Sequence, residues 1–323
     1  MILKVKNLSV DFEFDSQAVS ALRDICFQVA EGESVGLVGE SGSGKSLLSL
    51  AIMGLLPSNA KISKGEILFE NSNLICLSPE RLREIRGDRL SMIFQDPMSA
   101  LNPVLNLEKQ MGLLLRAHEG SLSAGQIRDR SIELFRLVGL PDPVLRLRSF
   151  PHEMSGGQAQ RVMIAMAMAC HPKLLIADEP TTALDVTIQA QVMSLLRRLQ
   201  AEKKLAMIVI SHDLALVSQN TQRIYVLYGG EIVETGSTKQ ITETPKHPYT
   251  QALLSCLPAR QKEDEKMITI QGQVPSLRNR PKGCQFQTRC PHKQVRCEVE
   301  RPEMNDSSVR CFYPESYHYS TGP

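Results

Sequence analysis

Short apolar runs separated by polar turns dominate the chain, and their spacing changes along its length. Near the N-terminus, Leu3–Val10 and Ile25–Val29 alternate apolar and polar positions, as strands of a half-exposed antiparallel sheet do. Three later runs, Ser34–Val38, Lys173–Ala177 and Leu205–Ile210, are almost continuously apolar, which is typical of parallel strands buried on both faces. The pattern therefore predicts an α/β protein with a parallel sheet and a separate antiparallel sheet.

The middle of the chain changes to a helical period. Between residues 105 and 147 apolar positions recur at helical spacing, interrupted only around Glu119-Gly120 and at two prolines. Because this stretch stands between strands of the core, we expect an inserted helical subdomain at about residues 96–165.

The end of the chain has two different parts. Ile224–Tyr228 and Glu231–Glu234 predict a hairpin that turns at Gly229-Gly230. Beyond residue 257 the chain becomes polar and proline-bearing, with no long periodic stretch. We therefore expect a nucleotide-binding domain at residues 1–257 and a small, irregular, cysteine-rich C-terminal extension at residues 258–323.

The stretch after the first buried strand has the composition of a phosphate-binding loop. Gly39-Glu40-Ser41-Gly42-Ser43-Gly44-Lys45-Ser46, called the phosphate loop below, fits G-x-x-x-x-G-K-S/T. Its glycines let the backbone N–H groups approach an anion, Lys45 reaches the terminal phosphates, and the Ser46 hydroxyl ligates magnesium. A helix follows directly, and its N-terminus favours negative charge. The loop predicts that a nucleotide binds here with Mg²⁺.

Polar side chains follow three of the predicted strands. Asp178 and Glu179 end an apolar strand, where they suit phosphoryl transfer: Asp178 holds magnesium and Glu179 polarises the attacking water. A solvated acidic turn is the alternative. His212 and Gln95 end two other strands, and Pro97 makes the exit at Gln95 a candidate hinge. We expect Gln95, Glu179 and His212 to lie at one edge of the sheet.

Two further features have both a binding and a structural interpretation. Ser155-Gly156-Gly157 precedes a strongly apolar helix, so it predicts either a second anion site or an ordinary helix N-cap. Phe12 and Phe14 lie in the expected turn between the first two strands, where either ring stacks on a purine or packs at the sheet edge.

Composition narrows the class of protein. The chain has 323 residues, 42% hydrophobic and 22% charged, as in an ordinary globular protein, and a net charge of +2 gives no case for nucleic-acid binding. No apolar run reaches the roughly 18 residues that a membrane span needs. The N-terminus lacks the regions of a signal peptide, so we expect a cytosolic chain that is able to dock on a membrane protein.

Four of the eight cysteines crowd into the C-terminal extension. Cys284, Cys290, Cys297 and Cys311 are separated by five, six and thirteen residues, and Pro291 follows Cys290. Disulfides are disfavoured in the cytosol, whereas four thiolates suit tetrahedral zinc or a four-iron cluster. The spacing is not that of a common zinc ribbon. Zinc, an iron-sulfur cluster and unliganded cysteines all stay open at this point.

In order along the chain, these motifs resemble the nucleotide-binding subunits of ABC transporters. The family's Walker A, Q-loop, signature, Walker B, D-loop and switch histidine correspond to Gly39–Ser46, Gln95, Ser155-Gly156-Gly157-Gln158, Leu174–Glu179, Ala183-Leu184-Asp185 and His212. The resemblance implies a P-loop NTPase fold, with a RecA-like core, an antiparallel β subdomain and an inserted α-helical subdomain.

The resemblance also implies roles for single residues. In the family, two subunits sandwich two ATP molecules, and each signature completes the partner's site, which gives Ser155–Gln158 its task. Phe12 stacks on adenine, and His212 holds the γ-phosphate and orients Glu179. Gln95, Ser46 and Asp178 attend the Mg²⁺ ion. The remaining positions at the nucleotide are Gly39, Ser41, Gly42, Ser43, Gly44, Lys45 and Asp185.

Phe94–Pro103 and His247–Leu254 narrow the resemblance to the ATPases of dipeptide and oligopeptide importers. It implies an ATP-hydrolysing translocase subunit, peripheral at the cytoplasmic face of the inner membrane. Its partners would be a paralogous ABC ATPase, two polytopic permeases and an extracytoplasmic solute-binding protein. The alternatives are import of nickel chelates or another small solute, and a soluble ABC ATPase outside transport. The family's tail also favours a 4Fe–4S cluster on the four cysteines, with zinc as the alternative.

Overall fold

The computed structural model describes the whole chain except residues 15–16, 183, 258–268 and 315–323. The chain divides into two compact units. The first unit comprises residues 1–2, 29–33 and 76–209, and the second comprises residues 3–28, 34–75 and 210–323. The expected domain boundary at residue 258 and the D-loop residue Ala183 lie outside the described residues.

The first unit contains a run of neighbouring strands in the order β8–β7–β6. Strands β6 (Leu90–Ile93) and β7 (Leu174–Asp178) are parallel, with Leu90 opposite Leu174 and Ile93 opposite Ala177. Strand β8 spans Ala206–Ser211, and its last two residues, Ile210 and Ser211, belong to the second unit. Every residue of these three strands is buried, which explains why their sequences are continuously apolar rather than alternating.

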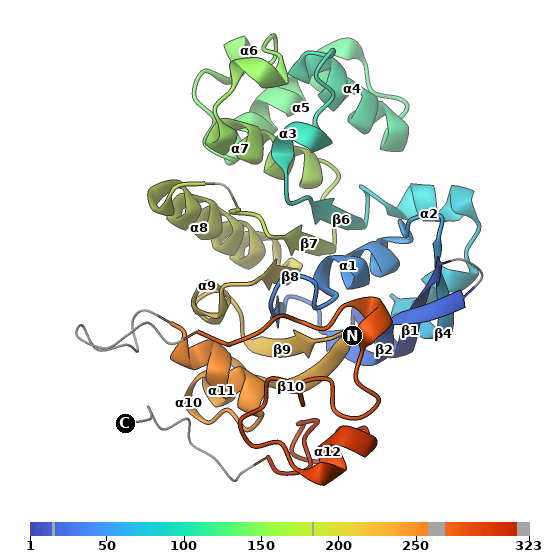
Figure 1. Ribbon diagram of the computed structural model, residues 1–323. Coiled ribbons are helices and arrows are strands. Elements are labelled where there is room, and N and C mark those ends of the chain that lie inside the picture. Colours follow the sequence, from blue (N-terminus) through green and yellow to red (C-terminus); the bar gives the residue numbers. More distant parts are fainter. Residues whose placement is uncertain (15–16, 183, 258–268, 315–323) are drawn as a thin grey trace. The chain divides into compact units, whose positions relative to one another are not determined.

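The helices expected between β6 and β7 are present and form a group in Figure 1. Their apolar residues recur at helical spacing: Leu107, Met111 and Leu115 are fully buried on one helix, and Ile127 and Phe135 are buried on the next. The helices of the group are α3 (Pro97–Ala100), α4 (Leu107–His118), α5 (Ala124–Leu137), α6 (Pro143–Arg146) and α7 (Gly156–Ala167), with the 3₁₀ turn η2 (Pro151–Glu153). Two helices of this unit lie outside the group, α2 (Pro79–Ile85) and α8 (Val186–Lys203).

The second unit contains the antiparallel sheet that the alternating pattern predicts, in the order β2–β1–β4–β5. The strand β1 continues to Phe14, so Phe12 and Phe14 lie within a strand and not in a turn as expected. A second run of strands, β10–β9–β3, includes the predicted hairpin and a parallel pairing of β3 with β9. The strands are β1 (Leu3–Phe14), β2 (Gln17–Val29), β3 (Ser34–Val38), β4 (Ala60–Phe69), β5 (Ser72–Asn73), β9 (Arg223–Tyr228) and β10 (Glu231–Ser237).

The helices of the second unit are short. They are α1 (Lys45–Met53), α9 (Leu214–Ser218), α10 (Thr238–Glu243), α11 (Pro248–Ser255), α12 (Val295–Val299) and the 3₁₀ turn η4 (Leu277–Asn279), and a further 3₁₀ turn, η1, spans Leu74–Cys76. In the described part of the chain, no helix has both the length and the apolar character to cross a bilayer.

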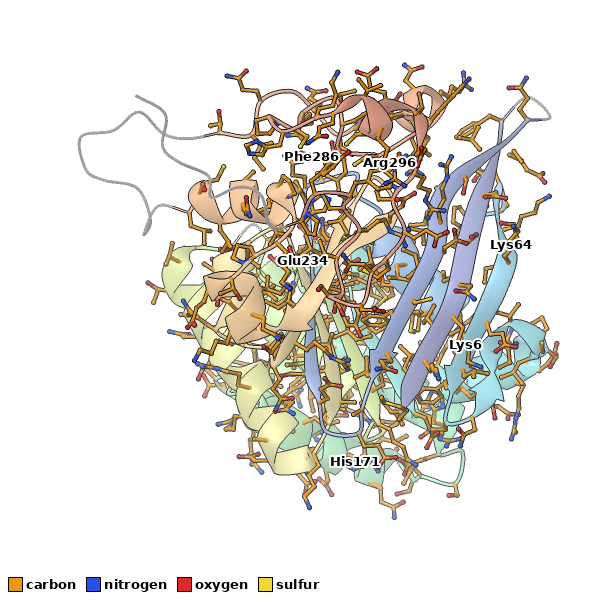
Figure 2. All side chains as sticks on the ribbon, turned by 90° about the horizontal axis from the view of Figure 1, so that it is seen from below. Lys6, Lys64, His171, Glu234, Phe286 and Arg296 are labelled. Atoms are coloured by element: carbon orange, nitrogen blue, oxygen red, sulfur yellow. The ribbon has the colours of Figure 1, made fainter. Side chains whose placement is uncertain are left out.

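The described part of the C-terminal extension, residues 269–314, packs within the second unit. Phe286 and Val309 are fully buried. The backbone of Ser308 accepts a hydrogen bond from Thr235 at 3.0 Å, and Glu234 pairs with Val309 across an isolated antiparallel bridge. Figure 2 shows Phe286 in the extension and Glu234 on β10. The extension therefore adds to the edge of the β10 strand.

Candidate ATP-binding and catalytic site

The phosphate loop joins β3 to α1, as the sequence predicts. A Cβ atom on Gly39 would lie 2.2 Å from the Leu227 carbonyl oxygen, so no other residue fits where the loop leaves the strand. Gly44 has a φ of +108°, a backbone conformation that residues with a side chain rarely adopt. These two glycines therefore fix the path of the loop into the helix.

Hydrogen bonds within the second unit hold the phosphate loop in one conformation. The Lys45 ammonium donates to the carbonyl oxygens of Gly39 at 2.7 Å and Glu40 at 3.0 Å, and the Lys45 residue is 4% exposed. The Ser43 N–H donates to the Glu40 carbonyl, and the Ser43 carbonyl accepts from Gly230 N–H at 2.8 Å. The backbone carbonyl groups of the loop thus hold the Lys45 ammonium where an anion bound by the loop would lie close to it.

The other predicted residues of the second unit are Phe12 and His212. Phe12 is half-buried and stacks on Phe14, with ring centroids 5.9 Å apart. His212 is exposed in the turn between β8 and α9. The carboxylate of Asp213 accepts the N–H of Ala215 at 2.8 Å and so caps α9, which defines this turn.

In the first unit, two predicted residues meet directly. The amide of Gln95, after β6, donates to Glu179 Oε2 at 3.0 Å, and the hydroxyl of Thr182 donates to the same oxygen at 2.9 Å. Parallel neighbours β6 and β7 end at one edge, which is why these side chains converge. Thr182 was not expected from the sequence, because a threonine two positions after a proline carries no motif signal of its own.

The residues at the end of β7 differ in burial. Asp178 is 4% exposed, whereas Glu179 is half-buried. Glu179 has a φ of +46°, the left-handed region that is uncommon for a residue with a side chain and costs roughly 1–3 kcal/mol. The two hydrogen bonds to its carboxylate hold the side chain of a strained residue in one orientation. A carboxylate placed in this way is suited to accept a proton from water.

The signature segment begins α7 with a capping box. Ser155 Oγ accepts the N–H of Gln158 at 3.3 Å, and the Gln158 side chain accepts the N–H of Ser155 at 3.2 Å. A Cβ atom on Gly157 would lie 2.9 Å from Ile188, so glycine is needed where α7 approaches α8. Asp185 caps α8 by accepting the Ile188 N–H at 2.9 Å. The expected N-cap is confirmed, and an anion site at the same helix start stays a prediction.

The predicted nucleotide residues are divided between the two units. Phe12, the phosphate loop and His212 belong to the second unit. Gln95, Asp178, Glu179, the Ser155–Gln158 segment and Asp185 belong to the first.

The four cysteines of the extension line one small pocket of about 20 Å³, together with His247. Burial raises the pKa of the Cys284 thiol to about 12 and that of Cys290 to about 11, and neighbouring thiols add to both shifts. In the described residues, however, no three or more His, Cys, Asp or Glu side chains are arranged as a metal-binding group. The cysteines are gathered as expected, but the ligand geometry of an iron-sulfur or zinc site is not shown.

Comparison with known proteins identifies the class. Residues 22–182 match the ABC transporter family, and residues 233–297 match the family described as the C-terminal region of oligopeptide/dipeptide transporters. The ATP-binding cassette MJ0796, solved as a dimer in a post-hydrolysis state bound to ADP and Pi, is similar to the chain in fold. Its TM-score is 0.66 at 31% identity, over 73% of this chain and 98% of the other. Fold and motifs together define an ABC ATPase of the P-loop class.

Two curated relatives narrow the family. The dipeptide transport ATP-binding protein DppD of Haemophilus influenzae is 48% identical over 97% of this chain and 96% of its own length. The protein of the same name from Escherichia coli is 46% identical over 97% of both chains. The chain therefore belongs to the ATP-binding subunits of dipeptide and oligopeptide ABC transporters.

Proposed function

We propose that the chain hydrolyses ATP to drive uptake of dipeptides or oligopeptides through partner membrane subunits. The observation that carries the ATPase function is the Glu179 carboxylate, oriented by Gln95 and Thr182 directly after the buried Asp178. The peptide substrate is supported by the names of the relatives and by the match of the C-terminal region. Import of nickel chelates or another small solute remains the alternative for the cargo.

Nucleotide binding and hydrolysis use different residues in this proposal. Lys45 and the backbone N–H groups of the phosphate loop bind the phosphates, while Ser46 and Asp178 attend the Mg²⁺ ion. Glu179 is the general base for the attacking water, and Gln95 reports the state of the γ-phosphate to the helices that follow β6. His212 contacts the γ-phosphate. The ring of Phe12 stacks on adenine.

The start of α7 suits a task in a second subunit's site. Ser155 and the following glycine N–H groups form a helix N-terminus, which attracts phosphate. A relative in fold is a dimer of cassettes. We infer that Ser155–Gln158 and Asp185 complete the ATP site of a second, paralogous ATPase subunit. Two membrane permeases and an extracytoplasmic solute-binding protein complete the transporter, which places this chain at the cytoplasmic face of the inner membrane.

Substitution of the base tests the ATPase assignment. Glu179→Gln keeps the shape of the side chain, so ATP binding should persist while hydrolysis in the assembled transporter falls about 10²–10⁴-fold. Glu202→Gln, an exposed glutamate on α8, is the matched control and should hydrolyse ATP at the parental rate. A parental rate in Glu179→Gln would remove Glu179 from the base role. Uptake of labelled dipeptide, with nickel chelates as competitors, separates the two classes of cargo.

We propose that the four cysteines of the extension hold a 4Fe–4S cluster. Four thiols line one pocket, and Cys284, Cys290 and Cys311 each accept a backbone hydrogen bond, which offsets part of the rise in thiol pKa that burial causes. The pocket has room for about one water, so the loops would move apart on loading. Once bound, the cluster would cross-link the extension through its thiolate ligands.

Metal content of the purified chain decides between the ligands. Under anaerobic purification we expect bound iron and sulfide with visible absorption, all lost in Cys284→Ser. Cys76→Ser, an exposed cysteine outside the extension, is the matched control and should keep them. A colourless protein with stoichiometric zinc would replace the cluster by the zinc alternative.

A further inference from the structure

The phosphate loop carries an acidic side chain at its second position, Glu40, beside a site for a polyanion. Arg289 of the C-terminal extension pairs with this carboxylate in two parallel bonds, Nη1 to Oε2 at 2.5 Å and Nη2 to Oε1 at 2.9 Å. The arginine side chain is only 3% exposed, and that of Glu40 is 30% exposed. A bidentate, largely buried arginine–carboxylate pair is among the stronger polar contacts in proteins.

The guanidinium of Arg289 is held in one place. Its Nε donates to the Gln271 carbonyl at 2.8 Å, Nη2 also donates to the Ile270 carbonyl at 3.2 Å, and Nη1 lies 3.4 Å from the Tyr228 hydroxyl. With the two bonds to Glu40, these contacts supply an acceptor for each of the five N–H donors of an arginine. The arginine therefore cannot turn away from the carboxylate without leaving buried donors unpaired.

The backbone of Glu40 is held by other groups. Its N–H donates to the Tyr249 hydroxyl at 2.9 Å, and its carbonyl oxygen accepts from the Ser43 N–H and from the Lys45 ammonium. The path of the phosphate loop thus does not depend on the ion pair. What Arg289 adds is charge: without it, the Glu40 carboxylate would oppose the attraction of Lys45 for the phosphates of ATP.

We propose that Arg289 is a positioning residue for ATP binding, which acts through Glu40 by neutralising and fixing its carboxylate, so that the C-terminal extension completes the phosphate site electrostatically. The sequence alone offers no sign of this contact, because 249 positions separate the two residues. By linkage, ATP binding and docking of the extension at this contact stabilise each other. The inference rests on the proposed function of Gly39–Ser46 as the ATP phosphate loop.

The test measures the dissociation constant for ATP in the full-length chain by equilibrium binding. Arg289→Gln should weaken binding about tenfold, which corresponds to about 1.4 kcal/mol. Arg289→Lys, which keeps the charge, should stay within about threefold of the parent. Glu40→Gln combined with Arg289→Gln removes both charges and should restore binding to about the parental value. A purely structural loss would not be rescued by that second substitution.

Arg296→Gln is the matched control. Arg296, labelled in Figure 2, precedes Cys297 as Arg289 precedes Cys290, but its guanidinium pairs with the exposed Glu300 at 2.7 Å. The Arg296→Gln variant should therefore bind ATP like the parent. Parental affinity in Arg289→Gln, or no rescue in the double variant, would overturn the inference. Equal weakening in Arg289→Lys and Arg289→Gln would also overturn it, because charge would then not be the cause. A parent chain that did not bind ATP would refute the phosphate-loop assignment before any variant was compared.

Discussion

Removing one buried carboxylate should loosen the C-terminal extension from the rest of its unit. Glu231 on β10 is 1% exposed, and its Oε1 lies 2.8 Å from Arg301 Nε, while Oε2 lies 3.9 Å from Arg310 Nε. Arg301 also pairs with Asp24 of β2 at 2.6 Å. This ion cluster ties the extension to both strands. We predict that Glu231→Gln, which keeps the shape and removes the charge, destabilises the protein.

The loss of unfolding free energy depends on which partners Arg301 and Arg310 keep in the variant. Breaking a buried ion pair by removing one partner costs roughly 3–5 kcal/mol, because the other charge is left uncompensated. Three features place Glu231→Gln at the lower end. Arg301 keeps Asp24, and Arg310 keeps the Ile232 carbonyl at 3.1 Å. Burial raises the pKa of Glu231, so its removal also relieves a desolvation cost. We expect about 3 kcal/mol.

Thermal unfolding of the full chain, followed by calorimetry, measures the effect. A loss of about 3 kcal/mol lowers the midpoint by about 4 °C in a chain of 323 residues, because the unfolding entropy is about 2.1 cal/mol/K per residue. Limited proteolysis should then cut faster within the extension. The matched control is Glu66→Gln, which breaks the exposed pair with Lys6 at 3.0 Å and should cost less than about 1 kcal/mol. If both variants melted together near the parent, the buried ion cluster would not anchor the extension.

Three further predictions concern other contacts. Thr182→Ala removes the hydroxyl that donates to Glu179 Oε2, so hydrolysis in the transporter should fall about tenfold at unchanged ATP affinity, and Thr182→Ser should recover it; an unchanged rate would contradict an orienting role. Ser155→Ala removes a helix cap worth about 1 kcal/mol of stability, and it should slow hydrolysis only in the assembled transporter, while ATP binding to the isolated chain stays parental. The hydrogen bond from Arg301 lowers the pKa of Asp24 in the folded protein, so this pair stabilises the fold fully above the ordinary carboxyl pKa, near pH 4. The stabilisation is lost as the pH falls through the lowered pKa of the folded state. The difference in unfolding free energy between the parent and Asp24→Asn should therefore shrink in acid, and a difference that grew would refute the pairing.

Much of the molecule could be predicted locally. The phosphate loop, the buried strands β3 and β7 and the N-cap at Ser155 all follow from short-range pattern, because glycine placement, apolar runs and caps act over a few residues. The same reasoning placed Phe12 in a turn, although it lies within β1. That prediction was wrong because pairing of Phe12 with Ala60 on β4 continues the strand beyond its alternating part.

The sequence by itself determined the family to which the chain belongs and predicted which residues carry phosphate chemistry, since both depend on residue type and spacing. Only the tertiary structure decided how distant residues act on them. Gln95 reaches Glu179, 84 positions away, because the parallel strands β6 and β7 end at the same edge of the sheet. Arg289 reaches Glu40 because the extension folds back onto the phosphate loop's own unit. Such contacts depend on long-range packing, and a short stretch of sequence does not encode which distant charge will meet it.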